Sequence, residues 1–233
     1  MDDELEDMIF VRNEKVCGIG PWLWPKENSV YKNDNGDLVS DGGLWVGPKN
    51  DFEITHQFLV YDACKHFNVV VQAGGGAGMY PRLLAKRFNH VYTFEPHYVN
   101  FHCLVHNCIS PNINKMQAAL GNENKMVGML CSEQNYGEGK IIEGVGEGNI
   151  PMLKIDQFAL WACDLIWLDI EGSELGALEG AVETIKKFRP VVVLENGHMY
   201  GIPDLMDSLN YTHKETSSSD YIYVPREAFN EQV

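Results

Sequence analysis

The chain has 233 residues, of which 45% are hydrophobic, enough to bury the core of one medium-sized domain. Charged residues make up 22%, and Gly and Pro are near ordinary usage, which excludes a wholly disordered, collagen-like or coiled-coil chain. The formal charge of -15 argues against general affinity for nucleic acid or for an anionic membrane surface, because an acidic protein repels both.

Two further features favour a cytoplasmic protein. The longest apolar runs are far shorter than the ~20 residues of a membrane helix, and the N-terminal MDDELED is acidic where a signal peptide is basic. The cysteines form no CxxC pair and are scattered through apolar segments. We therefore expect reduced, mostly buried thiols at Cys17, Cys64, Cys103, Cys108, Cys131 and Cys163.

Residues 1–50 alternate Gly and Pro turns with aromatic side chains, which predicts an irregular extension outside the main domain of residues 51–233. Trp22, Trp24 and Trp45 are expected to anchor this extension by packing. The alternative is that they form part of a substrate wall.

From Asp51 onward, apolar β-branched runs alternate with segments of helical periodicity. The helices are predicted at about 51–66, 80–88, 99–108 and 173–187, the last capped by Ser173 and stopped by Arg189-Pro190. The strands are predicted at 69–71, 91–94, 115–119, 165–168 and 191–194. A hairpin or excursion is expected from 127 to 148, and an antiparallel hairpin from 211–213 and 221–224. Fully apolar strands between helices are typical of an α/β fold whose parallel sheet is covered on both faces.

The first of these strands ends in QAGGGAGM, which places Gly74, Gly76 and Gly78 in a GxGxG spacing. Glycines between a strand and a helix let a ligand approach the backbone and the helix N-terminus. The run is not a Walker loop, because no Gly-Lys-Ser/Thr follows, and Met79 stands where a dinucleotide fingerprint has its third glycine. A tight turn without a ligand is the alternative interpretation.

The second strand ends at Glu95, about 20 residues beyond the glycine turn, where an acidic side chain can accept hydrogen bonds from a ribose diol. The alternative is a glutamate that merely stabilises the start of the next helix.

Polar residues also follow the fourth and fifth strands. Because ligands of open α/β sheets bind at the carboxyl ends of the strands, we expect these residues to converge near the cofactor: Asp169, Glu171, Glu195, Asn196 and His198.

These motifs together resemble the FkbM family, a branch of the class I S-adenosylmethionine-dependent methyltransferases. The resemblance runs from about Phe52 to Val224, and its most specific part is the DIEGSEL run from Asp169 with the later LEGA. Its other elements are the glycine turn, Phe94-Glu95-Pro96, Asn107, Ala118-Ala119-Leu120-Gly121 and Arg189-Pro190 before Leu194-Glu195-Asn196.

The resemblance implies a seven-stranded Rossmann-like sheet with an antiparallel last strand, and methyl transfer from S-adenosyl-L-methionine, typically to a hydroxyl of a sugar or small metabolite. It also implies that Gly74, Gly76 and Gly78 line the methionine part of the cofactor, that Glu95 holds the ribose and that Ala119 lies beside the adenine. Gln72 replaces the family's usual acidic residue. Its carbonyl can accept the same hydrogen bond from the cofactor's amino group but adds no charge attraction.

Two mechanisms remain open for a hydroxyl acceptor. His198 or Glu195 can take the proton, or Asp169, Glu195 and Asn196 can bind a divalent metal, the less favoured version. Two other functions also remain open. One is a non-catalytic S-adenosylmethionine-binding module, and the other is a nicotinamide-dependent oxidoreductase, although the GxGxG spacing argues against it. The expected partner is a small-molecule or sugar acceptor, with no nucleic acid and no membrane.

Overall fold

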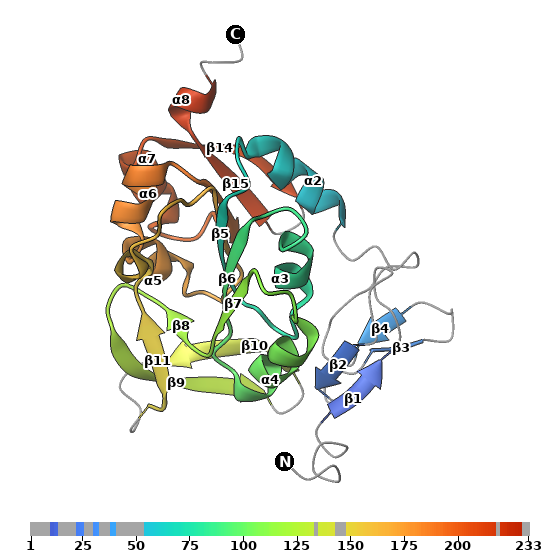
Figure 1. Ribbon diagram of the computed structural model, residues 1–233. Helices are drawn as coiled ribbons and strands as arrows, with labels where there is room; N and C mark the ends of the chain where they lie inside the picture. Colours follow the sequence, from blue (N-terminus) through green and yellow to red (C-terminus); the bar gives the residue numbers. More distant parts are fainter. Residues whose placement is uncertain are drawn as a thin grey trace.

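A computed structural model describes residues 10–13, 22–25, 30–32, 38–40, 54–132, 135–142, 148–217 and 220–229. Its central feature is a seven-stranded sheet in the order β14-β15-β13-β12-β5-β6-β7 (Figure 1). The strands are β5 (Val69–Ala73), β6 (His90–Phe94), β7 (Ile113–Met116), β12 (Leu165–Leu168), β13 (Val191–Glu195), β14 (Tyr211–Ser217) and β15 (Asp220–Pro225). β15 is antiparallel to both of its neighbours, and all other pairs are parallel. The predicted Rossmann-like sheet with an antiparallel last strand is confirmed.

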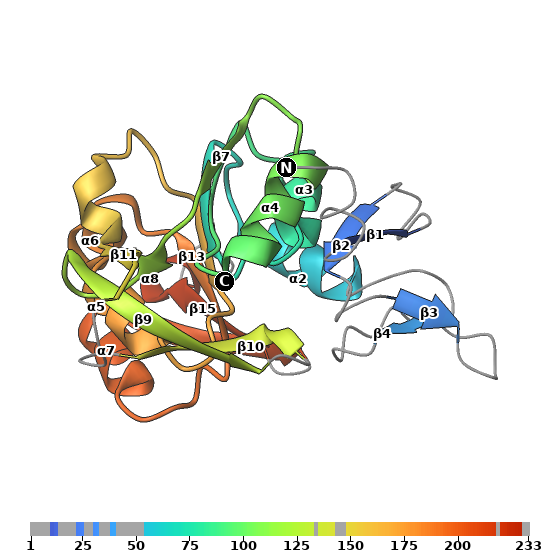
Figure 2. The same cartoon turned by 90° about the horizontal axis from the view of Figure 1, so that it is seen from below.

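Helices cover both faces of this sheet (Figures 1 and 2). One layer contains α2 (Ile54–Ala63), α3 (Met79–Leu84) and α4 (Tyr98–Asn107), and the other contains α5 (Glu174–Glu179), α6 (Val182–Phe188) and α7 (Ile202–Ser208). Successive strand residues contribute to opposite cores: Val70 and Trp167 pack under the first layer, and Val71 and Leu168 under the second. Burying one such aliphatic side chain contributes about 1.5–3 kcal/mol, which explains why these strands are apolar throughout.

A second, four-stranded sheet in the order β10-β9-β11-β8 lies at one end of the first (Figure 1). It contains β8 (Ala119–Leu120), β9 (Lys125–Ser132), β10 (Asn135–Ile142) and β11 (Ile150–Leu153), and a 3-10 turn, η2 (Ile155–Phe158), follows. β9 and β10 are the hairpin that the sequence predicted between 127 and 148. The single strand predicted at 115–119 is instead divided: β7 ends at Met116 in the large sheet, and β8 begins at Ala119 in the small one.

The helix predicted from 173 to 187 is two helices, α5 and α6, separated at Gly180 and Ala181. A Cβ at Gly180 would lie 2.0 Å from the carbonyl oxygen of Gly121, so only glycine permits this close approach. α6 then begins where the carboxylate of Asp156 accepts the backbone N–H groups of Glu183 at 3.1 Å and Thr184 at 2.8 Å. The start of α6 is thus capped by a residue distant in sequence, where the periodicity had predicted one continuous helix.

Ser173 does precede α5, but its side chain makes no capping hydrogen bond. Glu174, the first residue of α5, instead accepts a hydrogen bond from the preceding loop, with its Oε1 3.0 Å from the backbone nitrogen of Ile170. The buried Glu174 carboxyl therefore fixes the loop between β12 and α5, beside the predicted catalytic residues.

The predicted irregular extension contains two antiparallel strand pairs, β1 (Phe10–Asn13) with β2 (Trp22–Pro25) and β3 (Val30–Lys32) with β4 (Leu38–Ser40). β2 lies against α4 (Figures 1 and 2). The side chains of Trp22 and Trp24, and all of Trp45, fall outside the described residues, so their predicted roles stay predictions.

The cysteines that the structure describes are free thiols, as predicted, and Cys103, Cys108 and Cys163 are buried. Burial raises the pKa of the Cys108 thiol to about 12, which keeps it protonated. Cys17 falls outside the described ranges. Across those ranges, every helix lacks the length and apolar content that crossing a bilayer would require.

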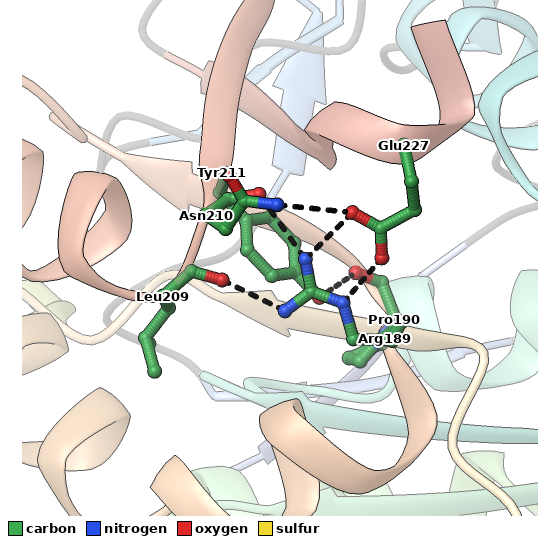
Figure 3. Close-up of polar contacts among 6 residues, drawn as sticks. All are labelled: Arg189, Pro190, Leu209, Asn210, Tyr211 and Glu227. Carbon is green, nitrogen blue, oxygen red and sulfur yellow. Dashed lines mark hydrogen bonds and ion pairs between the residues drawn. The ribbon is translucent and has the colours of Figure 1, made fainter. Parts of the chain in front are cut away.

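Arg189 ties the C-terminal part of the chain to the amino-terminal edge of the sheet (Figure 3). Its guanidinium forms a two-pronged pair with Glu227 of α8 (Arg226–Phe229), at 2.6 and 3.0 Å. It also donates to the carbonyls of Leu209 and Asn210 and lies 4.6 Å from the ring centre of Tyr211. The predicted helix stop at Arg189-Pro190 is thus also the anchor for the segment that carries β14 and β15.

Candidate functional site

All of the predicted site residues except Ala119 lie at the ends of four adjacent strands of the large sheet. β13, β12, β5 and β6 are neighbours in that order, and all four are parallel. The glycine turn follows β5, Glu95 follows β6, Asp169 follows β12, and Glu195 ends β13. The sheet therefore brings these groups together at the carboxyl ends of its parallel strands, where ligands of such folds usually bind.

The glycine turn has the backbone shape that its sequence requires. Gly74, Gly76 and Gly78 have φ values of +82°, +50° and +98°, which L side chains rarely adopt. A Cβ at Gly74 would meet the Asp169 carbonyl oxygen at 1.8 Å, whereas one at Gly76 would meet nothing within 4 Å. Gly74 thus permits close packing of two strand ends, while Gly76 borders open space where a ligand can approach the backbone.

Glu95 is joined to this turn directly. Its carboxylate accepts the backbone N–H of Gly76 at 2.7 Å and that of His97 at 2.9 Å. The side chain is buried, and this burial raises the pKa of Glu95 to about 7, although the two backbone hydrogen bonds oppose the shift. The glycine turn and Glu95, the residue predicted to hold the ribose, are therefore joined by direct hydrogen bonds.

Gln72 has partners that the sequence did not indicate. Its Oε1 accepts the hydroxyl of Thr93 at 2.6 Å, and its Nε2 donates to the carbonyls of Ala73 at 3.0 Å and Gly74 at 2.9 Å. The side chain is 1% exposed. Gln72 therefore supports the start of the glycine turn from inside the protein, and its predicted contact with the cofactor stays a prediction.

Three carboxylates meet next to the turn. Asp169, Glu171 and Glu195 each place an oxygen within 4.8 Å of the others. The carboxyls of Asp169 and Glu195 are in hydrogen-bond contact, and burial together with the charge of Glu195 raises the pKa of Asp169 well above its usual range. Oε2 of Glu195 is buried and accepts no hydrogen bond from the described residues. Burial and the neighbouring Glu195 thus favour the neutral form of the Asp169 carboxyl, and Oε2 of Glu195 is available as an acceptor atom.

Asp220 belongs to the same cluster but was not predicted. It lies opposite Glu195 in the β13–β15 register and is 8% exposed. Burial and the charge of Glu195 raise the pKa of Asp220 to about 7. The only sequence signal was its place at the start of the second strand of the closing hairpin, which becomes informative once the register with β13 is known.

The remaining predicted residues lie around this centre. The ring of His198 is exposed and stacks on Tyr221, with ring centres 5.2 Å apart. Asn196 is exposed in the turn between Glu195 and His198, with a φ of +51°. Ala119 is buried in the small sheet against Val127 and Met152. The roles of His198 and Ala119, and the metal set containing Asn196, stay predictions.

The part of the chain from α3 to β14, which contains Glu95 and the adjacent carboxylates Asp169, Glu171 and Glu195, matches a known protein family. A family model described as the methyltransferase FkbM domain matches residues 79–215, more than half of the chain. A search of curated proteins found no match to the sequence.

Solved structures resemble the fold at low sequence identity. A methyltransferase FkbM from Methylobacillus flagellatus KT aligns with a TM-score of 0.49 and 16% identity over 75% of this chain. The match covers 52% of that structure, so the present chain spans about half of its length. A precorrin-6y C5,15-methyltransferase from Geobacter metallireducens GS-15 aligns with a TM-score of 0.46 and 10% identity, over 76% of this chain and 88% of that one.

Proposed function

Because this chain belongs to the FkbM methyltransferase family, we propose that it transfers the methyl group of S-adenosyl-L-methionine to a hydroxyl of a sugar or another small molecule. When bound, the cofactor supplies an electrophilic methyl group on a sulfonium. The residues present fit it: the backbone at Gly76 borders open space, and Glu95 accepts hydrogen bonds beside that turn. Gly74, Gly76 and Gly78 would line the methionine part, and Glu95 would hold the ribose.

The observation that supports a hydroxyl acceptor is the buried Oε2 atom of Glu195, which accepts no hydrogen bond from the described residues and lies next to Asp169. A hydroxyl becomes a good methyl acceptor as it loses its proton, and a positioned carboxylate can take that proton in the transition state. Asp169 lies in hydrogen-bond contact with Glu195, and burial together with the charge of Glu195 raises the pKa of Asp169. Methyl transfer otherwise needs mainly alignment of the reacting groups and exclusion of water. The carboxylate cluster is half-buried and lies at the same strand ends as the glycine turn.

The test uses the full-length protein and release of S-adenosylhomocysteine as its readout. S-adenosylhomocysteine alone should raise the melting temperature, because a ligand that binds only the folded state stabilises it. Turnover should then appear with members of a panel of sugars, glycolipids and phenols, and not with matched primary amines. Absence of any melting shift at saturating ligand would exclude the methyltransferase. Binding without turnover on any acceptor would favour a non-catalytic module, and turnover restricted to amines would exclude the hydroxyl acceptor.

A further inference from the structure

A single buried side chain connects the N-terminal segment to the glycine turn. Asn107 is the last residue of α4 and is 3% exposed. Its Oδ1 accepts the backbone N–H of Leu23 at 2.8 Å, and its Nδ2 donates to the Leu23 carbonyl at 2.7 Å. The second hydrogen of Nδ2 goes to the carbonyl of Ala77, also at 2.7 Å. The side-chain amide of Asn107 thus pairs with the backbone of Leu23 as a neighbouring strand would. The same planar amide also holds the glycine turn through the Ala77 carbonyl.

The turn itself is seated on the end of α4. A Cβ at Gly78 would lie 2.6 Å from the sulfur of Cys108 and 3.4 Å from the Cα of Leu104. The Cys108 thiol donates to the carbonyl of Gly78 at 3.2 Å. Because the turn has almost no free space on this side, a shift of the α4 end displaces Ala77 and Gly78 directly.

On the other side, Leu23 is fixed by packing as well as by its backbone. It is 2% exposed in β2, and β2 is paired with β1 while it lies against α4 (Figure 2). Both backbone hydrogen-bonding groups of Leu23 go to Asn107. If β2 leaves α4, the Asn107 amide loses two of its three hydrogen bonds and keeps only the one to the Ala77 carbonyl.

We propose that Asn107 is a positioning residue that couples the seating of β2 to the shape of the cofactor turn. This proposal rests on the proposed function, since it assigns the turn to S-adenosylmethionine. When β2 lies on α4, its hydrogen bonds fix the orientation of the Asn107 side-chain amide. The amide in turn fixes the Ala77 carbonyl, so that the glycine turn keeps the conformation that accepts the cofactor. Because coupling between sites is reciprocal, cofactor binding holds β2 in place with the same free energy.

The experiment compares backbone hydrogen exchange and S-adenosylhomocysteine affinity in the full-length protein. Leu23→Ala is the decisive variant, because it loosens β2 without removing any contact to the turn. Ligand-free exchange should accelerate at residues 22–24 and also at 74–78, and affinity should fall several-fold. Asn107→Ala should weaken binding by tenfold or more and should abolish the slowing of exchange at 22–24 that the ligand causes in the wild type.

The matched control is Asn112→Ala. The Asn112 amide likewise donates to two carbonyls, those of Ala85 at 3.0 Å and Phe88 at 2.9 Å, but it does so beyond the other end of α3. The Asn112→Ala variant should be less stable than the wild type but should show unchanged hydrogen exchange at residues 74–78. The proposal is overturned if Leu23→Ala matches this control in exchange at 74–78 and in affinity. If the wild type binds no S-adenosylhomocysteine, the proposed function fails, yet ligand-free exchange at 74–78 still decides whether β2 and the turn are coupled.

Discussion

Glu95 holds Gly76: the carboxylate at the end of β6 accepts the N–H of the turn that follows β5, 2.7 Å away. The same carboxylate binds the His97 N–H at the start of the next helix. One acidic side chain therefore sets the spacing between the glycine turn and the place where a ribose diol would bind. Its removal affects both the ligand contact and the turn.

Glu95→Gln should weaken S-adenosylhomocysteine binding by about 10- to 100-fold. The NH₂ group that replaces one carboxylate oxygen would face a backbone N–H donor and could not accept its hydrogen bond. The remaining hydrogen bonds would also lose their charge assistance, a loss of about 1–3 kcal/mol. Isothermal titration calorimetry measures the change. Glu179→Gln, at an exposed glutamate that binds Asn122, is the control and should bind normally. Wild-type affinity in Glu95→Gln would place the ribose elsewhere.

Gln72→Glu should destabilise the protein near neutral pH, by about 1–3 kcal/mol. The new carboxylate would face the carbonyls of Ala73 and Gly74 without the two N–H donors that now bind them. Since burial raises the pKa of such a carboxyl, the loss should grow as pH rises above the unfolded-state pKa and should be smaller at pH 5. Urea unfolding at pH 5 and pH 8 tests this, with exposed Gln157→Glu as the control. Equal stability of variant and wild type at pH 8 would contradict it.

The ligand-free protein should be more stable near pH 5 than near pH 8. The pKa values of Glu95 and Asp220 are raised to about 7 in the folded state, so the native protein binds more protons than the unfolded chain between about pH 4 and 7. Stability from these groups is present at low pH and is lost as pH rises through about 7, by roughly 1–3 kcal/mol.

Asp220→Asn isolates this effect from the overall negative charge. It should flatten the pH dependence, whereas Asp62→Asn, which removes an exposed carboxyl from α2, should not. Thermal unfolding from pH 5 to pH 8 is the measurement. Parallel pH profiles for the two variants would show that Asp220 titrates normally.

Asp169→Asn and Glu195→Gln should each lower turnover by about 10²-fold or more while S-adenosylhomocysteine binding stays near normal. Groups that position the acceptor or take its proton act mainly in the transition state. Exposed Glu183→Gln is the control. Turnover like that of the wild type in both variants would move the chemistry away from these strand ends. Loss of turnover on chelation, with recovery in magnesium, would favour the metal version over a carboxylate base.

Arg189→Lys should lower the free energy of unfolding by about 1–3 kcal/mol without changing cofactor affinity. A lysine cannot reproduce the two-pronged pair with Glu227 together with both carbonyl contacts. Arg226→Lys, at an exposed pair with Asp207, should cost at most about 1 kcal/mol. Urea unfolding compares the two. A similar loss of unfolding free energy in both variants would show that the Arg189 contacts stabilise the protein no more than an ordinary surface ion pair.

The sequence predicted the elements whose signal is local. The runs at Val69 and Leu165 are apolar throughout because their strands are buried on both faces, so their type and place were evident. The break at Gly180 depends on Gly121, which is distant in sequence and close only in the fold. Likewise, Asp220 joins Glu195 through strand register, and Gln72 is occupied by Thr93 of a neighbouring strand. Such partners carry no signal in the periodicity around either residue.

The position of β15 has a consequence for the order in which the protein can be assembled. β15 lies between β13 and β14, although β14 precedes it in the chain, so β14 has no partner in the large sheet until β15 is made. During synthesis the ribosome releases Gly74 and Glu95 long before Asp220. The part of the site that contains the glycine turn and Glu95 can form on the nascent chain, whereas the carboxylate cluster is completed only when the strand that carries Asp220 is made. A ribosome-bound intermediate ending before residue 220 should accordingly be able to bind the cofactor before it can turn it over.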